Sequence, residues 1–189
     1  MTEQHVAHVL PTVVAGDPIE RLASLFDVHY ERLYRLARRL VPSADDALDL
    51  VQETFLRAAR SPFKIPVGKP NEEAWLVRVL INIRRDQWRR TSARDRLDKP
   101  GFGRGRPAIG GDNPEEALIA KTAVWRALNT LPPRRRAIVV MYELEGLAIP
   151  AIASLLGISG ITVRWHLSTG RRVLTRELKA YMGESNENH

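Results

Sequence analysis

Apolar side chains recur at every third or fourth position through the first part of the chain, with arginine and glutamate between them. This spacing places them on one face of an α-helix, so the segment Leu22–Leu40 is predicted to be a helix with one buried face. Pro42 ends it, because proline removes a backbone donor and clashes inside a helix. The predicted buried positions are Leu22, Leu25, Phe26, Leu33, Leu36 and Leu40.

A second helix is predicted directly after Pro42. Ser43 is a favourable N-cap residue, and Asp45 and Asp46 then occupy the first turn, where carboxylates interact favourably with the helix dipole. The buried face of this helix is predicted to contain Leu50, Val51, Thr54, Phe55 and Ala58.

The stretch Ser61–Asn71 (SPFKIPVGKPN) contains three prolines and one glycine, so a non-helical, irregular loop is predicted there. Asn71 is expected to cap a long helix over Glu72–Arg90. The buried face of that helix is predicted to contain Leu76, Val79, Leu80 and Ile83. Since no run of alternating β-branched residues follows anywhere, the whole chain is predicted to be α-helical.

Between Arg94 and Gly111 the composition shifts to five glycines, two prolines and many charges, which predicts a flexible linker. A new helix then begins, with Asn113 as N-cap, Pro114 at the first helical position and Glu116 in the capping-box position. Its predicted buried residues are Leu118, Val124, Leu128 and Leu131. The fold class is therefore all-α, with two small helical domains and a linker. The expected segments are a leader at 1–20, a first domain at 21–93, a linker at 94–112, a second domain at 113–180 and a tail at 181–189.

The second domain ends in a helix-turn-helix pattern. After Leu131-Pro-Pro133, a helix over about residues 134–145 ends at Gly146, and two further helices meet near Gly157. Gly157 favours the left-handed conformation that closes a helix, and Ser159 can cap the next one. Val163, Leu167, Leu174 and Leu178 are predicted to be buried, which leaves an opposite face of Ile161, Arg164, Trp165, Ser168 and Arg172. Such a helix fits the major groove of B-DNA, although a plain helical hairpin has the same pattern.

Charge supports a polyanionic partner. Lysine and arginine number 29 against 22 aspartates and glutamates, a net charge of +7, which favours nucleic acid or an anionic membrane face. The cluster Arg134–Arg136 and the pair Arg171–Arg172 are candidates for phosphate contacts. No apolar run approaches the ~20 residues of a membrane span, so we expect no membrane insertion and a cytosolic chain. The N-terminal stretch lacks the basic region of a signal peptide.

Catalysis and cofactors are not expected. The chain contains no cysteine, which excludes disulfides, thiolate metal sites and cysteine nucleophiles. Its histidines have no carboxylates at ligand or triad spacing, and His5 and His8 lie in the leader. The sequence therefore predicts neither an enzyme nor a metal or cofactor site.

A second nucleic-acid signal lies in the first domain. Arg78, Asn82, Arg85 and Arg89 follow helical spacing and form one polar stripe, which could equally be a solvated basic face. The adjacent loop adds Phe63, Lys64 and Lys69, close to Trp75. Aromatic and cationic side chains together suit unstacked single-stranded bases.

A third surface is acidic and belongs to the second helix. It contains Asp45, Asp46, Asp49, Gln52 and Glu53. Carboxylates repel DNA, so this face suits a basic protein partner, with simple complementation of the helix dipole as the alternative.

Three motifs together resemble a known family. The stretch DALDLVQETFLRA resembles the helix by which bacterial sigma factors bind core RNA polymerase, and EEAWLVRVLINIRRDQWRR resembles the following helix, which reads the melted promoter. The region LNTLPPRRR to VRWHL resembles the helix-turn-helix that reads the upstream element. Since two domains and a linker account for the chain, it resembles the extracytoplasmic-function (ECF) group.

The resemblance implies a function and a set of contacts. The first domain would be sigma region 2, which holds the polymerase and captures bases of the −10 element; the second would be region 4, which binds the −35 element. Polymerase contacts are expected at Asp46, Asp49, Gln52 and Glu53. Contacts with −10 DNA are expected at Phe63, Lys64, Lys69, Arg78, Asn82, Arg85 and Arg89. Contacts with −35 DNA are expected at Arg164, Trp165, Ser168, Thr169, Arg171 and Arg172.

Several points stay open at the level of sequence. A helix-turn-helix regulator that never joins polymerase is the alternative function, but it does not explain DLVQETF. Ala148 to Ala151 replace the usual polar cap of the first helix of the helix-turn-helix, and Trp165 could pack between the domains instead of reading DNA. Ile149 and Pro150 are expected to be exposed, and with no sensor domain they suggest an anti-sigma factor as a further partner.

Overall fold

The computed structural model describes residues 17–97 and 114–186, and these residues form helices and turns without a strand. The N-terminal unit consists of α1 (Pro18–Leu40), α2 (Ala44–Arg60), the short 3-10 helix η1 (Pro62–Lys64) and α3 (Lys69–Leu97). The C-terminal unit consists of α4 (Pro114–Asn129), α5 (Pro133–Glu143), α6 (Ile149–Leu156) and α7 (Gly160–Asn186). The predicted all-α fold with a C-terminal helix-turn-helix is confirmed. Residues 1–16 of the expected leader and most of the linker lie outside the described residues, as do Asn113, His5 and His8, whereas the end of the expected leader, from Pro18, belongs to α1.

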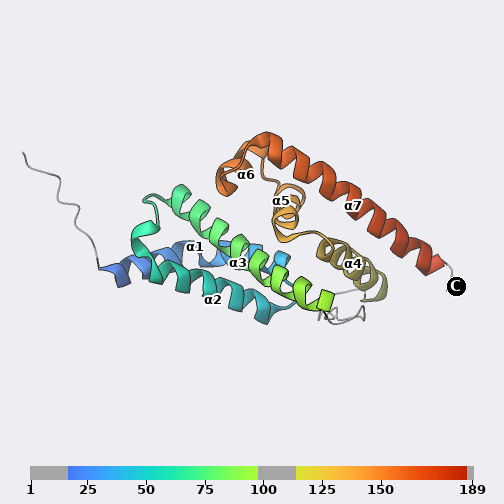
Figure 1. Cartoon of the computed structure of the whole chain (residues 1–189), viewed down its shortest axis with the longest axis horizontal. Coiled ribbons are helices and arrows are strands. Elements are labelled where there is room, and N and C mark those ends of the chain that lie inside the picture. Colours follow the sequence, from blue (N-terminus) through green and yellow to red (C-terminus); the bar gives the residue numbers. More distant parts are fainter. Residues whose placement is uncertain (1–16, 98–113, 187–189) are drawn as a thin grey trace, which may run out of the picture.

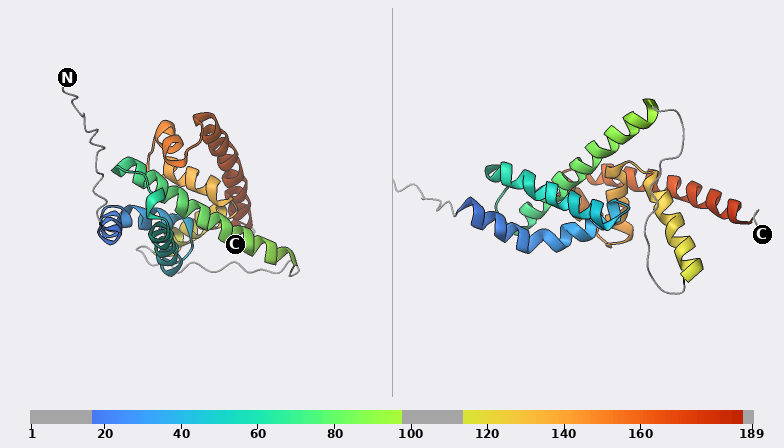
Figure 2. Two further views of the ribbon diagram at one scale, coloured as in Figure 1. Left: turned by 60° about the vertical axis from the view of Figure 1, so that its left-hand side comes forward. Right: turned by 90° about the horizontal axis from the view of Figure 1, so that it is seen from below.

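The two units pack against each other. Helices α1, α2 and α3 lie side by side, and α5 and α6 lie over α1 and α3, while α7 runs along the outer side of α4, α5 and α6 (Figure 1). The C-terminal part of α3 extends away from this contact, as the right-hand view in Figure 2 shows. The buried side chains of both units form one continuous apolar cluster.

Local chemistry explains where most helices begin and end. Ser43 accepts a hydrogen bond from the backbone N–H of Asp46 at 3.0 Å, and Ser159 accepts one from Thr162 at 3.1 Å, so both predicted N-caps are confirmed. Gly157 has φ +63°, the left-handed conformation predicted for the end of α6. The buried face predicted for α2 is also confirmed.

The start of α3 differs from the prediction. The helix begins at Lys69, because Gly68, with φ +98°, turns the chain directly into it. Asn71 therefore lies in the first turn and is not the cap; its side-chain amide donates to the carbonyl of Val67 at 3.1 Å. Part of the predicted irregular loop is η1, which proline can begin because it needs no donor there. The far end of α3 reaches Leu97 instead of Arg90.

Two residues predicted to be buried are exposed. Phe26 is 44% exposed, because it lies at the edge of the α1–α2 contact, where its ring stacks on Tyr30 and touches Phe55. Val124 is 45% exposed, because the buried face of α4 passes instead through Ala123 and Ala127. On α3, Leu76, Leu80 and Ile83 are buried as predicted, whereas Val79 is only half-buried. Leu174 and Leu178 on α7 are half-buried, and the side chain of Leu118 is outside the described set.

Two negative observations apply to residues 17–97 and 114–186. No helix there is both long and apolar enough to cross a membrane. In those same segments, no group of three or more histidine, cysteine, aspartate or glutamate side chains could hold a metal ion.

Candidate nucleic-acid and protein interfaces

A groove of about 460 Å³ between α2 and α3 collects most of the predicted polymerase contacts. Its lining residues are Asp49, Gln52, Glu53, Leu56, Arg57, Ile83, Asp86, Gln87 and Arg90. Glu53 accepts a hydrogen bond from Arg57 Nε at 3.1 Å, which fixes its carboxylate along the helix. Asp46 does not line the groove; its carboxylate accepts a hydrogen bond from the Ser43 hydroxyl at 2.7 Å, so it belongs to the start of α2.

A second hollow, of about 310 Å³, opens beside the proline-rich segment. Its lining residues are Arg57, Arg60, Ser61, Lys64, Trp75, Val79 and Asn82. It therefore combines an aromatic side chain, an amide and several cations, the groups that bind an unstacked base and its phosphates. Lys64 and Asn82 were predicted from the sequence, but Arg57, Arg60 and Val79 were not. Phe63 does not line this hollow and is 91% exposed on η1.

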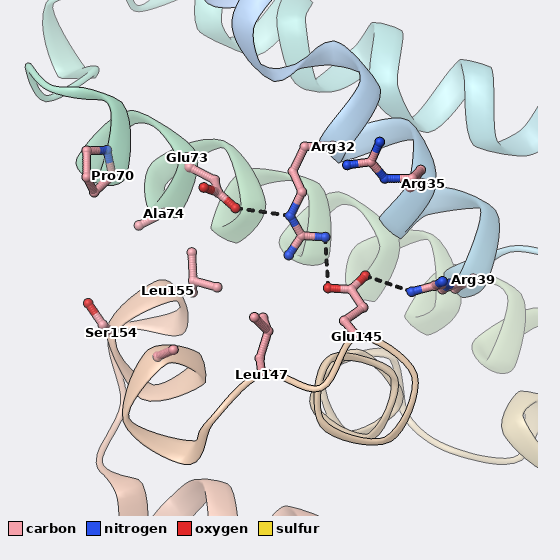
Figure 3. A pocket seen from close by; sticks show the side chains of 11 residues that line it. Arg32, Arg35, Arg39, Pro70, Glu73, Ala74, Glu145, Leu147, Ser154 and Leu155 are labelled. Carbon is pink, nitrogen blue, oxygen red and sulfur yellow. Dashed lines mark hydrogen bonds and ion pairs between the residues drawn. The ribbon is translucent and has the colours of Figure 1, made fainter.

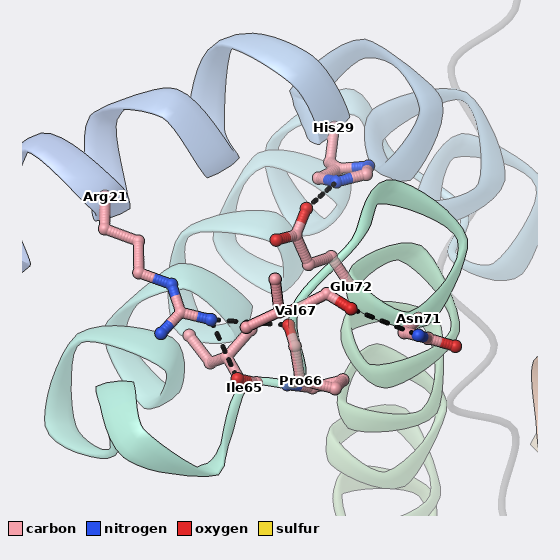
Figure 4. Close-up of polar contacts among 7 residues, drawn as sticks. All are labelled: Arg21, His29, Ile65, Pro66, Val67, Asn71 and Glu72. Atoms are coloured by element: carbon pink, nitrogen blue, oxygen red, sulfur yellow. Dashed lines mark hydrogen bonds and ion pairs between the residues drawn. The ribbon is translucent and has the colours of Figure 1, made fainter. Parts of the chain in front are cut away.

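Arg21 anchors the segment that carries this hollow. Its Nη2 atom donates to the carbonyl of Ile65 at 2.8 Å and to that of Pro66 at 3.3 Å, from α1 across to the loop (Figure 4). On the other side of the loop, His29 Nε2 lies 3.5 Å from a carboxylate oxygen of Glu72. No sequence signal marked Arg21, because its partners are backbone atoms more than forty positions away.

The residues of the predicted basic stripe on α3 lie in different surroundings. Asn82 lies in the hollow just described. Arg78 instead lies against the C-terminal unit, where a Cβ added to Gly157 would stand 3.0 Å from Arg78 Nη1. Of the other predicted −10 contacts on α3, three are exposed: Lys69, Arg85 and Arg89.

One flank of α7 faces the start of α6. Arg164, Ser168 and Arg171 line a shallow hollow of about 350 Å³ with Tyr142 and Ile149. Arg171 Nε donates to Glu143 at 2.7 Å, and this hydrogen bond, with the negative charge of Glu143, raises the pKa of Arg171. Ile149, expected to be exposed, is half-buried here because it packs against the core.

The other flank of α7 carries Trp165, which is 57% exposed. The Arg135 guanidinium lies 5.2 Å from the Trp165 ring centroid, and the His166 ring contacts the indole edge-on at 4.8 Å. Burial first, then the positive charges of Arg135 and Arg134, lower the pKa of His166. Since these contacts come from its own unit, Trp165 does not pack between the domains. Thr169 is half-buried and Arg172 exposed.

Comparison with known proteins decides the family. Residues 25–94 match the model for Sigma-70 region 2, and residues 121–174 match that for Sigma-70 region 4. The ECF RNA polymerase sigma factor SigM of Mycobacterium tuberculosis is 32% identical over 178 residues, covering 93% of this chain and 86% of SigM. This chain is an ECF sigma factor.

Other relatives agree. SigE of Mycolicibacterium smegmatis is 36% identical to this sigma factor over 160 residues, covering 83% of this chain but 61% of the relative's length. Among solved structures, the sigma factor RpoE of Bartonella quintana, in complex with the anti-sigma factor NepR, has a TM-score of 0.60 at 22% identity over 85% of this chain and 96% of that one. CnrH, in complex with the cytosolic domain of CnrY, has a TM-score of 0.57 at 25% identity over 87% and 91%. At 22% identity, the likeness to RpoE shows a shared fold.

Proposed function

We propose that this ECF sigma factor binds core RNA polymerase through the α2–α3 groove and directs initiation at promoters with its two DNA-binding units. The observation that carries the proposal is the position of Arg57, which lines both the groove and the aromatic hollow. A polymerase bound along the groove would thus lie directly beside the site for melted DNA. Synthesis of RNA belongs to the polymerase, so the chain itself is not an enzyme, and its place is the cytoplasm.

In the aromatic hollow, a base of the −10 element would be held by stacking and by hydrogen bonds. Trp75 offers an aromatic face, and the amide of Asn82 can both donate to and accept from the edge of a base. Arg60 and Lys64 supply positive charge for the flanking phosphates. Arg78 is proposed as a −10 contact as well, but it must first leave its position against Gly157.

On α7, the −35 element would meet two flanks with different chemistry. Arg164 and Ser168 are exposed at the flank beside α6 and offer donors for base edges. Trp165 presents an apolar ring that suits a thymine methyl group, and the Arg135 guanidinium lies 5.2 Å from the centroid of this ring. Arg172 and Arg171 are proposed as phosphate contacts, for which Arg171 must exchange Glu143 for DNA.

Charge reversal tests the polymerase surface. The double variant Asp49→Lys/Glu53→Lys should lose co-purification with core polymerase, because two carboxylates one turn apart become cations in a groove meant for a basic partner. The matched control is Asp27→Lys/Glu31→Lys, which reverses two exposed carboxylates at the same spacing on α1. Helicity should be unchanged in both. Equal polymerase binding by the two double variants would contradict the assignment.

A binding assay tests the −35 surface. The probe is a duplex selected from a random pool by the full-length wild-type chain, with an unselected duplex beside it. Arg164→Ala should weaken binding to the selected duplex alone, by about 1–3 kcal/mol if it pairs bidentately with a guanine. Arg172→Ala should weaken binding to both and reduce the salt slope by about one unit. If Arg164→Ala weakens both duplexes equally, α7 does not read bases through this side chain.

An anti-sigma partner is proposed for the cleft between the units. This cleft of about 530 Å³ has apolar walls, including Leu147 and Leu155, and an arginine-rich side on α1 (Figure 3). An amphipathic helix with acidic residues at its edge fits both properties. Leu155→Glu should abolish recovery of an inhibitory protein from the source cells while leaving polymerase binding intact. A chain that is always active in its own cell, with no such partner, would refute this proposal.

A further inference from the structure

Two large apolar side chains lie exposed on α7, the second helix of the helix-turn-helix. Among the side chains of α7 that the structure describes, Ile161 is 76% exposed and Trp165 is 57% exposed. They lie four positions apart, so they project from one face of the helix, opposite the buried Val163 and Leu167. Single exposed apolar residues are ordinary, but two on one face form a patch, and such patches mark interaction surfaces.

Cations lie on both flanks of this patch. Arg164 and Arg171 belong to the flank that faces α6, where both line the same hollow. On the other flank, the guanidinium of Arg135 lies 5.2 Å from the centroid of the Trp165 ring. The exposed Arg172 continues the face toward the C-terminus of the helix. An apolar centre between cations matches the major groove of DNA, because phosphates line both sides of that groove.

The floor of the major groove offers one apolar group. Thymine presents its C5-methyl group there, whereas the other bases present mainly hydrogen-bond donors and acceptors. An apolar side chain against a polar base edge removes water from that edge without replacing its hydrogen bonds, which costs free energy. Ile161 has no polar atom in its side chain. Of the four bases, thymine is therefore the one that fits it.

The position and rigidity of the two side chains suit contact with successive base pairs. In helices that bind the major groove, the N-terminal residues reach base edges, and side chains three or four positions apart contact successive pairs. Ile161 is the second residue of α7, in a turn fixed by the hydrogen bond from the Thr162 N–H to the Ser159 hydroxyl at 3.1 Å. The Trp165 ring contacts the His166 ring edge-on at 4.8 Å. Because the free protein already positions both groups, binding orders little that is mobile.

We propose that Ile161 and Trp165 recognise the C5-methyl groups of two thymines in successive base pairs of the −35 element. This inference rests on the proposed function, because it requires α7 to lie in the major groove at that element. Ile161 is not among the −35 contacts that the family resemblance implies, so it is an additional specificity-determining residue. The −35 element of this sigma factor therefore contains two successive T·A pairs that are recognised without a hydrogen bond to the thymines.

The test removes single methyl groups from the DNA. The probe is the duplex that the full-length chain, alone or with core polymerase bound, selects from a random pool. Selected duplexes should share two successive T·A pairs. Deoxyuridine in place of either thymine removes only the methyl group and should weaken binding about fourfold, the effect of one buried methyl. Deoxyuridine at a thymine outside the selected element is the control and should leave binding unchanged.

Side-chain variants assign each methyl group to a residue. In Ile161→Ala, the deoxyuridine penalty should vanish at one thymine and persist at the other, and in Trp165→Ala the reverse should hold. The matched control is Val124→Ala, which shortens a 45% exposed side chain of α4 and should keep both penalties. Circular dichroism checks that the variants are folded. If Trp165→Ala is unfolded, Ile161→Ala decides alone.

The outcomes separate this inference from the proposed function. Selected duplexes without two successive T·A pairs, or equal binding of thymine and deoxyuridine, would overturn the inference while −35 binding stands. Penalties that persist in both variants would overturn it as well, because other residues would then contact the methyl groups. If the two variants bind DNA normally but bind polymerase weakly, the patch is a protein interface and the inference is wrong. If no duplex is selected even with polymerase bound, the proposed −35 function itself fails.

Discussion

Gly170 of α7 makes the sharpest prediction about how the recognition helix is held. The residue is buried in the middle of the helix, where α7 crosses α5. A Cβ atom at this position would stand 2.7 Å from Val139 Cγ2, closer than carbon atoms approach without displacement, and 3.5 Å from Arg135 Cγ. Gly170→Ala therefore forces either Val139 or the helix itself to move.

Two terms of opposite sign set the size of the effect. Alanine is favoured over glycine inside a helix by about 1 kcal/mol. Overpacking of a close contact costs typically about 1–3 kcal/mol, because Val139 is itself fully packed in the core. The net expectation is a loss of roughly 0–2 kcal/mol in the free energy of unfolding. The sign of this stability change alone would be a weak test. The cost of the contact with Val139 must therefore be measured separately from the helix propensity of alanine.

A double-mutant cycle makes that separation. Urea unfolding followed by circular dichroism gives the midpoint and m value for wild type, Gly170→Ala, Val139→Ala and the double variant. Once Val139 is shortened, the added methyl has space, and Gly170→Ala should become stabilising by up to about 1 kcal/mol. The coupling between the two sites should be roughly 1–3 kcal/mol. Binding to the −35 duplex should weaken in Gly170→Ala and recover in part in the double variant, since the methyl displaces α7 from α5.

Gly160 provides the matched control. It also lies in α7, but a Cβ there would meet Ile149 Cγ2 at 3.5 Å, an ordinary van der Waals distance. Gly160→Ala should therefore be neutral or slightly stabilising and should leave DNA binding unchanged. The packing argument is refuted if Gly170→Ala stabilises the protein with Val139 in place, or if the cycle shows no coupling.

Three further predictions concern single side chains. Arg21→Ala should lower affinity for single-stranded −10 DNA because the loop at Ile65 loses its anchor; Arg21→Lys should restore part of it, and full affinity without the arginine would contradict this role. Ser159→Ala should cost about 1 kcal/mol of stability, measured by urea unfolding, because the N-cap of α7 is lost. Because the pKa of His166 is lowered in the fold, the unfolded chain binds the proton more readily, so stability should fall as pH drops below about 6.5. The pH dependence should be shallower in His166→Gln; identical curves would exclude His166 as its source.

Features fixed by neighbouring residues could be predicted from the sequence. Ser43, Gly157 and Ser159 act within three or four positions of themselves, so hydrogen-bonding and backbone preferences were sufficient to place the helix ends. That Asp49, Gln52 and Glu53 lie on one face of α2 could be predicted in the same way, because helical spacing alone places them together. The groove that this face forms with α3 could not.

Features that depend on contacts between residues far apart in the sequence could not be predicted. Arg21 contacts a loop 44 positions away, and Glu145 contacts Arg39 at a separation of 106 positions. No local sequence pattern predicts either contact. The same limit explains Phe26, whose apolar character fits a buried face although its position at the edge of α1 leaves it exposed. Helical periodicity predicts which face of a helix is buried. It does not predict which partner covers that face, or how much of the face is covered.

The missing side-chain cap of α6 has a consequence for local unfolding. This helix has eight residues, and Ala148 at its N-terminus offers no side-chain hydrogen bond. Isolated helices shorter than about 12–15 residues are marginal in water, so α6 depends on the surfaces it packs against. One of those surfaces is α3. The backbone amides of α6 should therefore exchange hydrogen faster whenever the two units separate. Because this helix is too short to persist alone, its exchange rate reports whether α6 is packed against α3.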